Sequence, residues 1–126
     1  MNRGSARGDM RPIWIQLSDE YRRRIAAGEW RAGARIPSVR ELALESGVNP
    51  NTVQRALAEL DARGLTAAER TTGRFVTVDA AAVDAVRADL AGATTDEHIR
   101  TLRGLGIGID DALRLLTERW PLTKGE

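Results

Sequence analysis

The chain of 126 residues has no cysteine and a single histidine. Disulfides and thiolate metal sites are therefore excluded, and one imidazole is too few for an ordinary metal centre, so we expect neither a metal nor another cofactor. No apolar run approaches the roughly 18 residues of a membrane span. The first ten residues also lack the apolar core of a secretory signal. These absences favour a cytoplasmic protein with no membrane partner.

The sequence also lacks the residue sets that enzymes use. His98 directly follows Asp96 and Glu97, and consecutive side chains on a helix point in different directions. Ser38 has no base near it in the sequence, and the glycines around Gly106 follow no strand of the kind that a dinucleotide-binding fold needs. We therefore predict that the protein is not an enzyme and has no catalytic residue.

The net charge of +1 hides an uneven distribution of charge along the chain. Residues 1–78 contain 13 arginines and nine acidic residues, which gives +4, whereas residues 79–126 contain six basic and nine acidic residues, which gives −3. This division is typical of a basic part that meets phosphate joined to an acidic part that meets protein.

Two short amphipathic helices are expected on either side of Gly47. Ser38 is a favourable N-cap for the first helix, and Asn49 followed by Pro50 is a favourable start for the second. The second helix has apolar residues at the spacing of one helix face, namely Val53, Ala56, Leu57 and Leu60. Its other face is polar, which is typical of a helix-turn-helix whose second helix enters the major groove of DNA.

A β-hairpin is expected after the helix stop at Gly64. Residues 65–69 and 74–78 have the character of strands, and the second of them is rich in β-branched residues. The turn between them carries Arg70, two threonines and Gly73. A basic tip of this kind suits the wing of a winged helix, which lies over the phosphate backbone or reaches the minor groove.

In order and spacing, residues 11–78 resemble the amino-terminal signature of the GntR family of bacterial transcription regulators. The segments that carry the resemblance are Pro12–Leu17, Ile25–Trp30, Pro37–Ala43, Asn49–Leu57 and Gly73–Val76. The chain departs from the pattern at Pro50, where some relatives have arginine, and at Thr71, where glycine is frequent. The short tail resembles that of the YtrA subfamily, which implies that the tail chiefly dimerises and leaves little room for an effector pocket.

The resemblance and the motif together identify the candidate DNA-binding residues. The family's contacts lie at the arginine of the Pro-Ser-x-Arg segment, at the start of the recognition helix and in the wing, and this implies Arg40, Asn49, Asn51, Thr52, Gln54, Thr72 and Gly73. Basic residues on the helix and beside the wing tip add Arg55, Arg70 and Arg74. The expected partner is a double-stranded DNA operator.

The tail leaves two helical structures open. Thr94 and Glu97 match a capping box that would open a new helix. The single helical register of Val83, Val86, Leu90, Thr94, His98, Leu102 and Leu105 favours instead one long helix that contains Gly92 at a cost of about 1 kcal/mol. We favour the long helix, followed by a glycine-rich turn and a last helix. The apolar residues expected to dimerise are Val83, Val86, Leu90, Leu102, Leu113, Leu116 and Trp120.

The sequence therefore predicts a mainly α protein with a small β-hairpin, a winged helix-turn-helix followed by a short helical dimerisation region. The expected parts are a flexible arm at residues 1–10, the DNA-binding domain at 11–78, the dimerisation region at 79–122 and a tail at 123–126. The function it predicts is a homodimeric repressor that binds an inverted-repeat operator. Two alternatives stay open: a metabolite sensor whose unidentified effector binds at the dimer seam and controls DNA release, and a winged helix that binds protein only.

Overall fold

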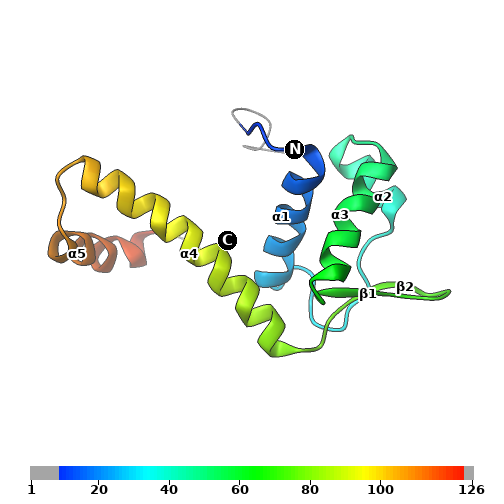
Figure 1. Cartoon of the computed structure of the whole chain (residues 1–126). Coiled ribbons are helices and arrows are strands. Elements are labelled where there is room, and N and C mark those ends of the chain that lie inside the picture. The colour runs from blue at the N-terminus through cyan, green and yellow to red at the C-terminus, as the bar shows by residue number, and fades with distance from the viewer. Residues whose placement is uncertain (1–8, 124–126) are drawn as a thin grey trace. The chain divides into compact units, whose positions relative to one another are not determined.

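The computed structural model describes residues 9–123, so most of the predicted arm and all but one residue of the predicted 123–126 tail lie outside the described part. The chain is mainly helical with one two-stranded antiparallel sheet (Figure 1), which confirms the predicted fold class. The elements in chain order are α1 (Ile13–Ala26), α2 (Val39–Ser46), α3 (Pro50–Ala62), β1 (Thr66–Glu69), β2 (Gly73–Val76), α4 (Ala80–Gly104), α5 (Ile109–Arg119) and the 3₁₀ turn η1 (Trp120–Leu122).

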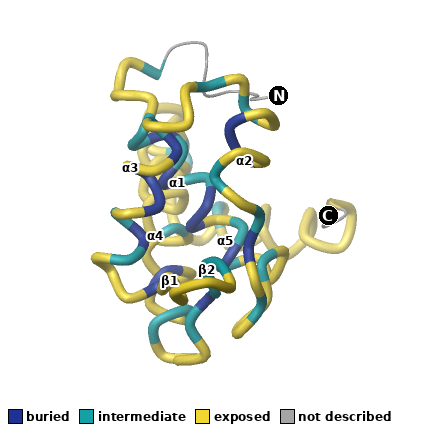
Figure 2. The backbone as a smooth tube through the Cα atoms, turned by 90° about the vertical axis from the view of Figure 1, so that its right-hand side faces the viewer, coloured by how far each residue is buried: buried dark blue, intermediate teal, exposed yellow. Residues whose placement is uncertain are grey.

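The chain forms two compact units, one that ends at Ala88 and one that begins at Asp89. The first unit has a hydrophobic core of its own, in which Tyr21, Leu42, Val53, Leu57 and Leu60 are almost completely buried. These residues come from α1, α2 and α3, and Figure 2 shows buried positions along all three helices. The core fixes the direction of α3, since α3 buries one complete stripe and leaves the other free.

Both helices of the predicted helix-turn-helix begin at the expected caps. Glu41 N donates to Ser38 Oγ at 3.1 Å and Ser38 N donates to Glu41 Oε1 at 2.8 Å, which completes a capping box. These hydrogen bonds lower the pKa of Glu41. Gly47 ends α2 with a φ of +69°, and Asn49 Oδ1 accepts from Asn51 N at 2.7 Å at the start of α3. The points where α2 begins and ends and where α3 begins therefore follow from local sequence.

The run of three arginines in α1 pairs with carboxylates of the first unit. Arg22 pairs with Asp19, and Arg23 pairs with Glu20 and Glu29. Arg24 pairs with Glu20 in α1 and with Glu45 in α2, and it lies over the rings of Tyr21 and Trp30. Since all three guanidinium groups have carboxylate partners, the run is a packing feature of α1.

The predicted boundary near residue 79 follows the hairpin, but the first compact unit runs further and includes the first turns of α4. Val86 in α4 is only 6% exposed, and Arg87 donates to Ala26 O, the last residue of α1, through Nε at 3.2 Å and Nη2 at 3.0 Å. The base of α4 thus caps the end of α1. The long helix favoured from the sequence is confirmed, because α4 continues through Gly92 to Gly104.

Candidate nucleic-acid interface

The exposed side of α3 is polar, as the sequence predicts. Asn51, Gln54 and Arg55 are exposed, Thr52 is half-buried, and the apolar stripe beneath them is buried. Asn49 precedes them, and its side-chain oxygen is committed to the cap while its amide NH₂ stays available as a donor. The amide groups on this face can bond the edges of bases in a major groove.

The arginines of the first unit fall into two groups. Those within residues 9–78 that have carboxylate partners are Arg11, Arg22, Arg23, Arg24, Arg63 and Arg74. Within the same residues, those with no such ion pair are Arg31, Arg35, Arg40, Arg55 and Arg70. All but Arg31 lie just before α2, at its start, on α3 or at the wing tip. Within residues 9–78, the arginines without an ion pair are therefore concentrated on the helix-turn-helix and the wing.

Arg55 is held in place by an aromatic ring. Its guanidinium carbon lies 4.3 Å from the ring centroid of Trp14 in α1. A cation stacked on an aromatic face keeps its N–H donors free at the edge of the guanidinium plane, so the contact orients Arg55 without using up its hydrogen-bonding capacity.

Arg74 lies elsewhere than the sequence suggests. Its Nε and Nη2 donate to the two carboxylate oxygens of Asp61 in α3, at 3.1 and 2.9 Å, and Thr66 Oγ1 donates to the same carboxylate at 2.5 Å. The Arg74 side chain is only 14% exposed. In β2 it shares a face with the buried Val76, because side chains alternate along a strand. Arg74 thus joins the base of the wing to the core.

The wing tip itself is polar and exposed. Arg70, Thr71 and Thr72 link β1 to β2 and are all exposed, and Gly73 opens β2 with a φ of +111°. The strand register pairs Glu69 with Gly73 and Thr66 with Val76. A side chain at position 73 would be strained at this φ, which explains the glycine.

One further residue belongs to this surface that the sequence did not single out. Arg35 precedes α2, is exposed, and pairs across an isolated antiparallel bridge with Phe75 in β2. Only this pairing between distant residues brings it beside the wing, and no local pattern reports it.

The second unit leaves most of its apolar surface uncovered. No residue from 89 to 123 is buried. Even its large apolar side chains are exposed: Leu113 is 53%, Leu116 is 44% and Trp120 is 75% exposed. Leu90 and Leu102 are half-covered, as is Val83 in the first unit. Of the residues predicted to dimerise, Val86 differs, since it is already buried within the first unit, where it is only 6% exposed.

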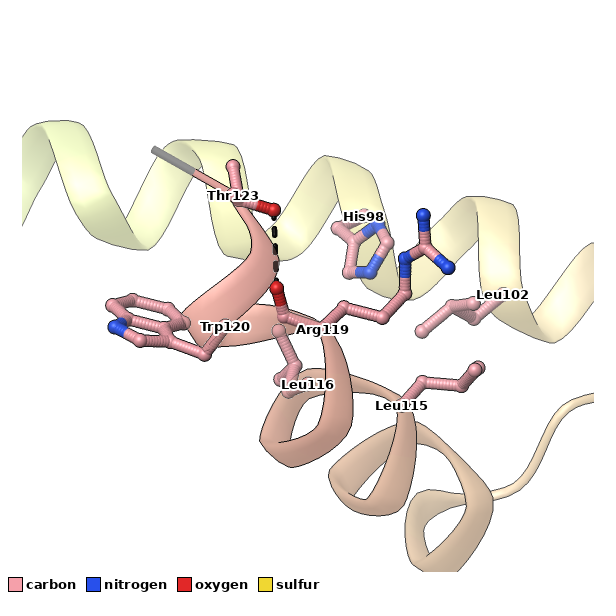
Figure 3. A pocket seen from close by; sticks show the side chains of 7 residues that line it. All are labelled: His98, Leu102, Leu115, Leu116, Arg119, Trp120 and Thr123. Atoms are coloured by element: carbon pink, nitrogen blue, oxygen red, sulfur yellow. Dashed lines mark hydrogen bonds between the residues drawn. The ribbon is translucent and has the colours of Figure 1, made fainter. Parts of the chain in front are cut away.

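A groove runs between α4 and the segment formed by α5 and η1 (Figure 3). Its volume is about 530 Å³ in the single chain. The residues that line it are His98, Leu102, Leu115, Leu116, Arg119, Trp120 and Thr123. Most of the lining is apolar, and His98, Arg119 and Thr123 add polar side chains to it.

In the part of the chain that the structure describes, no helix combines the length and the apolar character that crossing a membrane requires. Nor do three histidine, aspartate or glutamate side chains gather there as a metal site.

Comparison with known proteins identifies the family of this fold and this surface. Residues 16–76 match the family model described as bacterial regulatory proteins of the gntR family. A solved GntR family transcriptional regulator from Listeria monocytogenes is 33% identical, with a TM-score of 0.77 over 87% of this chain and 96% of that protein. The chain belongs to the GntR family. It is accordingly a helix-turn-helix transcriptional regulator and not an enzyme, as the sequence predicts.

Two further structures refine this assignment of the GntR regulator. YtrA from Sulfolobus acidocaldarius, a GntR-family transcription factor, is 31% identical with a TM-score of 0.52, over 70% of this chain and 92% of that one. This similarity supports the predicted YtrA-like subfamily. The DNA-binding domain of AraR in complex with its operator ORE1 is 29% identical with a TM-score of 0.52, over 54% of this chain and 83% of that one.

Proposed function

We propose that this GntR regulator is a homodimeric repressor that binds an inverted-repeat operator and thereby occludes a promoter. The observation that carries the proposal is the placement of the unpaired arginines Arg40, Arg55 and Arg70 around the polar face of α3. In this arrangement α3 reads bases in the major groove, and Arg40 and the wing fix its position on the backbone. The DNA-binding domain of AraR, which is similar to this chain, has been solved in complex with an operator, and this supports operator binding here.

The second unit supports the dimeric part of the proposal. Large apolar side chains are exposed along α5 and η1, and the unit contains no buried residue among those described. A helical segment of this size does not bury enough surface to be stable alone, and a second copy of the chain offers the same apolar stripe in return. The proposed dimer contact includes Leu90, Leu102, Leu113, Leu116 and Trp120, while Val86 contributes to the first unit instead.

Selection from a library of random DNA duplexes tests this function. We expect the full chain to enrich an inverted repeat whose half-sites lie about 34 to 36 Å apart, or a multiple of that distance, on one face of the duplex. Footprinting on the enriched sequence should protect both half-sites. Enrichment of a single half-site would contradict the dimeric mode, and no enrichment at all would contradict sequence-specific DNA binding.

A second candidate function is effector-controlled release of DNA, which the groove of Figure 3 favours. Its volume of about 530 Å³ is within the size range of small-molecule sites. If the regulator acts without an effector, dialysed and chelator-treated protein should bind the operator with unchanged affinity, and cell metabolites should not shift its melting temperature. A metabolite that binds at micromolar concentration and also weakens operator binding would establish the sensor instead.

A further inference from the structure

The segment just before α2 pairs with β2 by backbone hydrogen bonds and so extends the wing by a third, short segment. Ile36 N donates to Arg74 O and Val76 N donates to Ala34 O, both at 2.9 Å. Arg35 and Phe75 lie opposite each other between these two hydrogen bonds. In such a pair the two side chains leave the sheet on the same face and are close together, and a long side chain also reaches the diagonal neighbour two residues along.

The diagonal neighbour of Arg35 on β2 is Gly73. A Cβ atom placed on Gly73 would lie 2.7 Å from Arg35 Nε and 3.4 Å from Arg35 Cζ. The guanidinium therefore occupies the space that a side chain at position 73 would fill, and it packs directly on the backbone at the start of β2. The φ of +111° requires glycine at position 73, and a side chain there would also have to displace the Arg35 guanidinium.

Arg35 and Arg74 are on opposite faces of the same small sheet. Arg74 points toward α3 and pairs with Asp61, whereas Arg35 is exposed and forms no ion pair with any carboxylate of residues 9–123. Arg35 also lies just before Ser38, the N-cap of α2. The hydrogen bonds of Ser38 lower the pKa of Glu41, and the nearby charge of Arg35 adds to this effect. An ordered, unpaired cation thus lies between the start of α2 and the wing tip.

We infer that Arg35 binds a DNA backbone phosphate between the contacts of α2 and those of the wing, and that its packing on Gly73 holds the wing in its binding position. The inference rests on the proposed operator binding. A planar guanidinium suits both tasks, because one face packs on the peptide backbone while the edge offers paired N–H donors to a phosphate. The two tasks predict different results for removal of the charge and for removal of the planar group.

Operator and random duplexes, each titrated over a range of salt concentrations, test the phosphate contact. Arg35→Gln is expected to weaken binding to both duplexes by a similar factor of about ten and to lower the salt slope by about one. Arg35→Lys should keep the slope, since the charge remains, and lose part of the affinity, since an ammonium does not pack as a plane. Arg23→Gln is the matched control, because Arg23 is exposed on α1 and already paired with Glu20 and Glu29.

A double-mutant cycle tests the packing on Gly73. Gly73→Ala is expected to weaken operator binding strongly in the parent and less in an Arg35→Ala background, where the space above position 73 is free. Strict additivity would overturn the wing-positioning task, and an unchanged salt slope in Arg35→Gln would overturn the phosphate contact.

If Arg40→Gln weakens binding and Arg35→Gln does not, only this inference fails. If the parent itself binds no duplex, the proposed function fails. Circular dichroism and thermal unfolding of each variant show that the fold is intact.

Discussion

Replacing Gln54 by alanine is expected to weaken operator binding about 10-fold to 100-fold while leaving binding to random duplex nearly unchanged. Gln54 is exposed in the middle of the polar face of α3, and its amide can make a paired contact with one base edge. The loss of such a contact typically costs about 1 to 3 kcal/mol of discrimination. Stability should not change, because the side chain lies outside the core.

Arg40→Ala provides the contrast that separates reading from positioning. Arg40 lies in the first turn of α2 and has no carboxylate partner among the described residues. As a phosphate contact it should weaken operator and random duplex alike and lower the salt slope by about one. Arg23→Ala makes the same change of charge at a residue of α1 that is already paired with Glu20 and Glu29, and it should alter neither the affinity nor the salt slope. If Gln54→Ala and Arg40→Ala both bind operator as tightly as the parent at matched salt, the recognition surface is elsewhere.

Deleting residues 109–126 is expected to convert the dimer to a monomer and to reduce operator affinity by about 100-fold or more. The first unit should stay folded, because it contains every residue that is buried within residues 9–123. A single DNA-binding domain binds with the affinity of one half-site. In a dimer, binding of the first domain raises the effective concentration of the second at its own half-site. Sedimentation equilibrium measures the assembly and duplex titration the affinity.

A point substitution in α5 tests the same surface without removing it. Leu116→Glu places a charge on the exposed apolar stripe and should dissociate the dimer. Arg114→Gln is the matched control, since it lowers the net charge by the same amount on the side of α5 where Arg114 pairs with Asp111. A truncated chain that remains dimeric would locate the contact outside α5 and η1.

The helix-turn-helix could be predicted from the sequence because local rules determine it. The capping box at Ser38, the positive φ of Gly47 and the Asn49-Pro50 start of α3 each act within a few residues. The long α4 could also be predicted, since the helical register of Val83, Val86 and Leu90 resumes at Leu102 after Gly92. These features need no knowledge of the rest of the chain.

The positions of three other residues depend on tertiary contacts. Arg74 lies beside the wing tip in sequence, yet strand alternation places it with Val76 on the core side, against Asp61. Val86 is buried within the first unit, next to Arg87, which donates to Ala26 O at the end of α1, although its helical spacing matches an exposed stripe. Arg35 reaches Gly73 only through the pairing of Arg35 with Phe75. In each case the partner is far along the chain, so composition and periodicity could not supply it.

The affinity ratio between the selected operator and a scrambled duplex of the same length and composition, measured at one physiological salt concentration, tests the central claim most directly. Phosphate contacts are common to both duplexes, so the ratio isolates what α3 reads. A homodimer that reads two half-sites should prefer the operator by about a thousandfold or more. Equal affinity for the two duplexes would contradict the assignment of the α3 face as a sequence-reading surface.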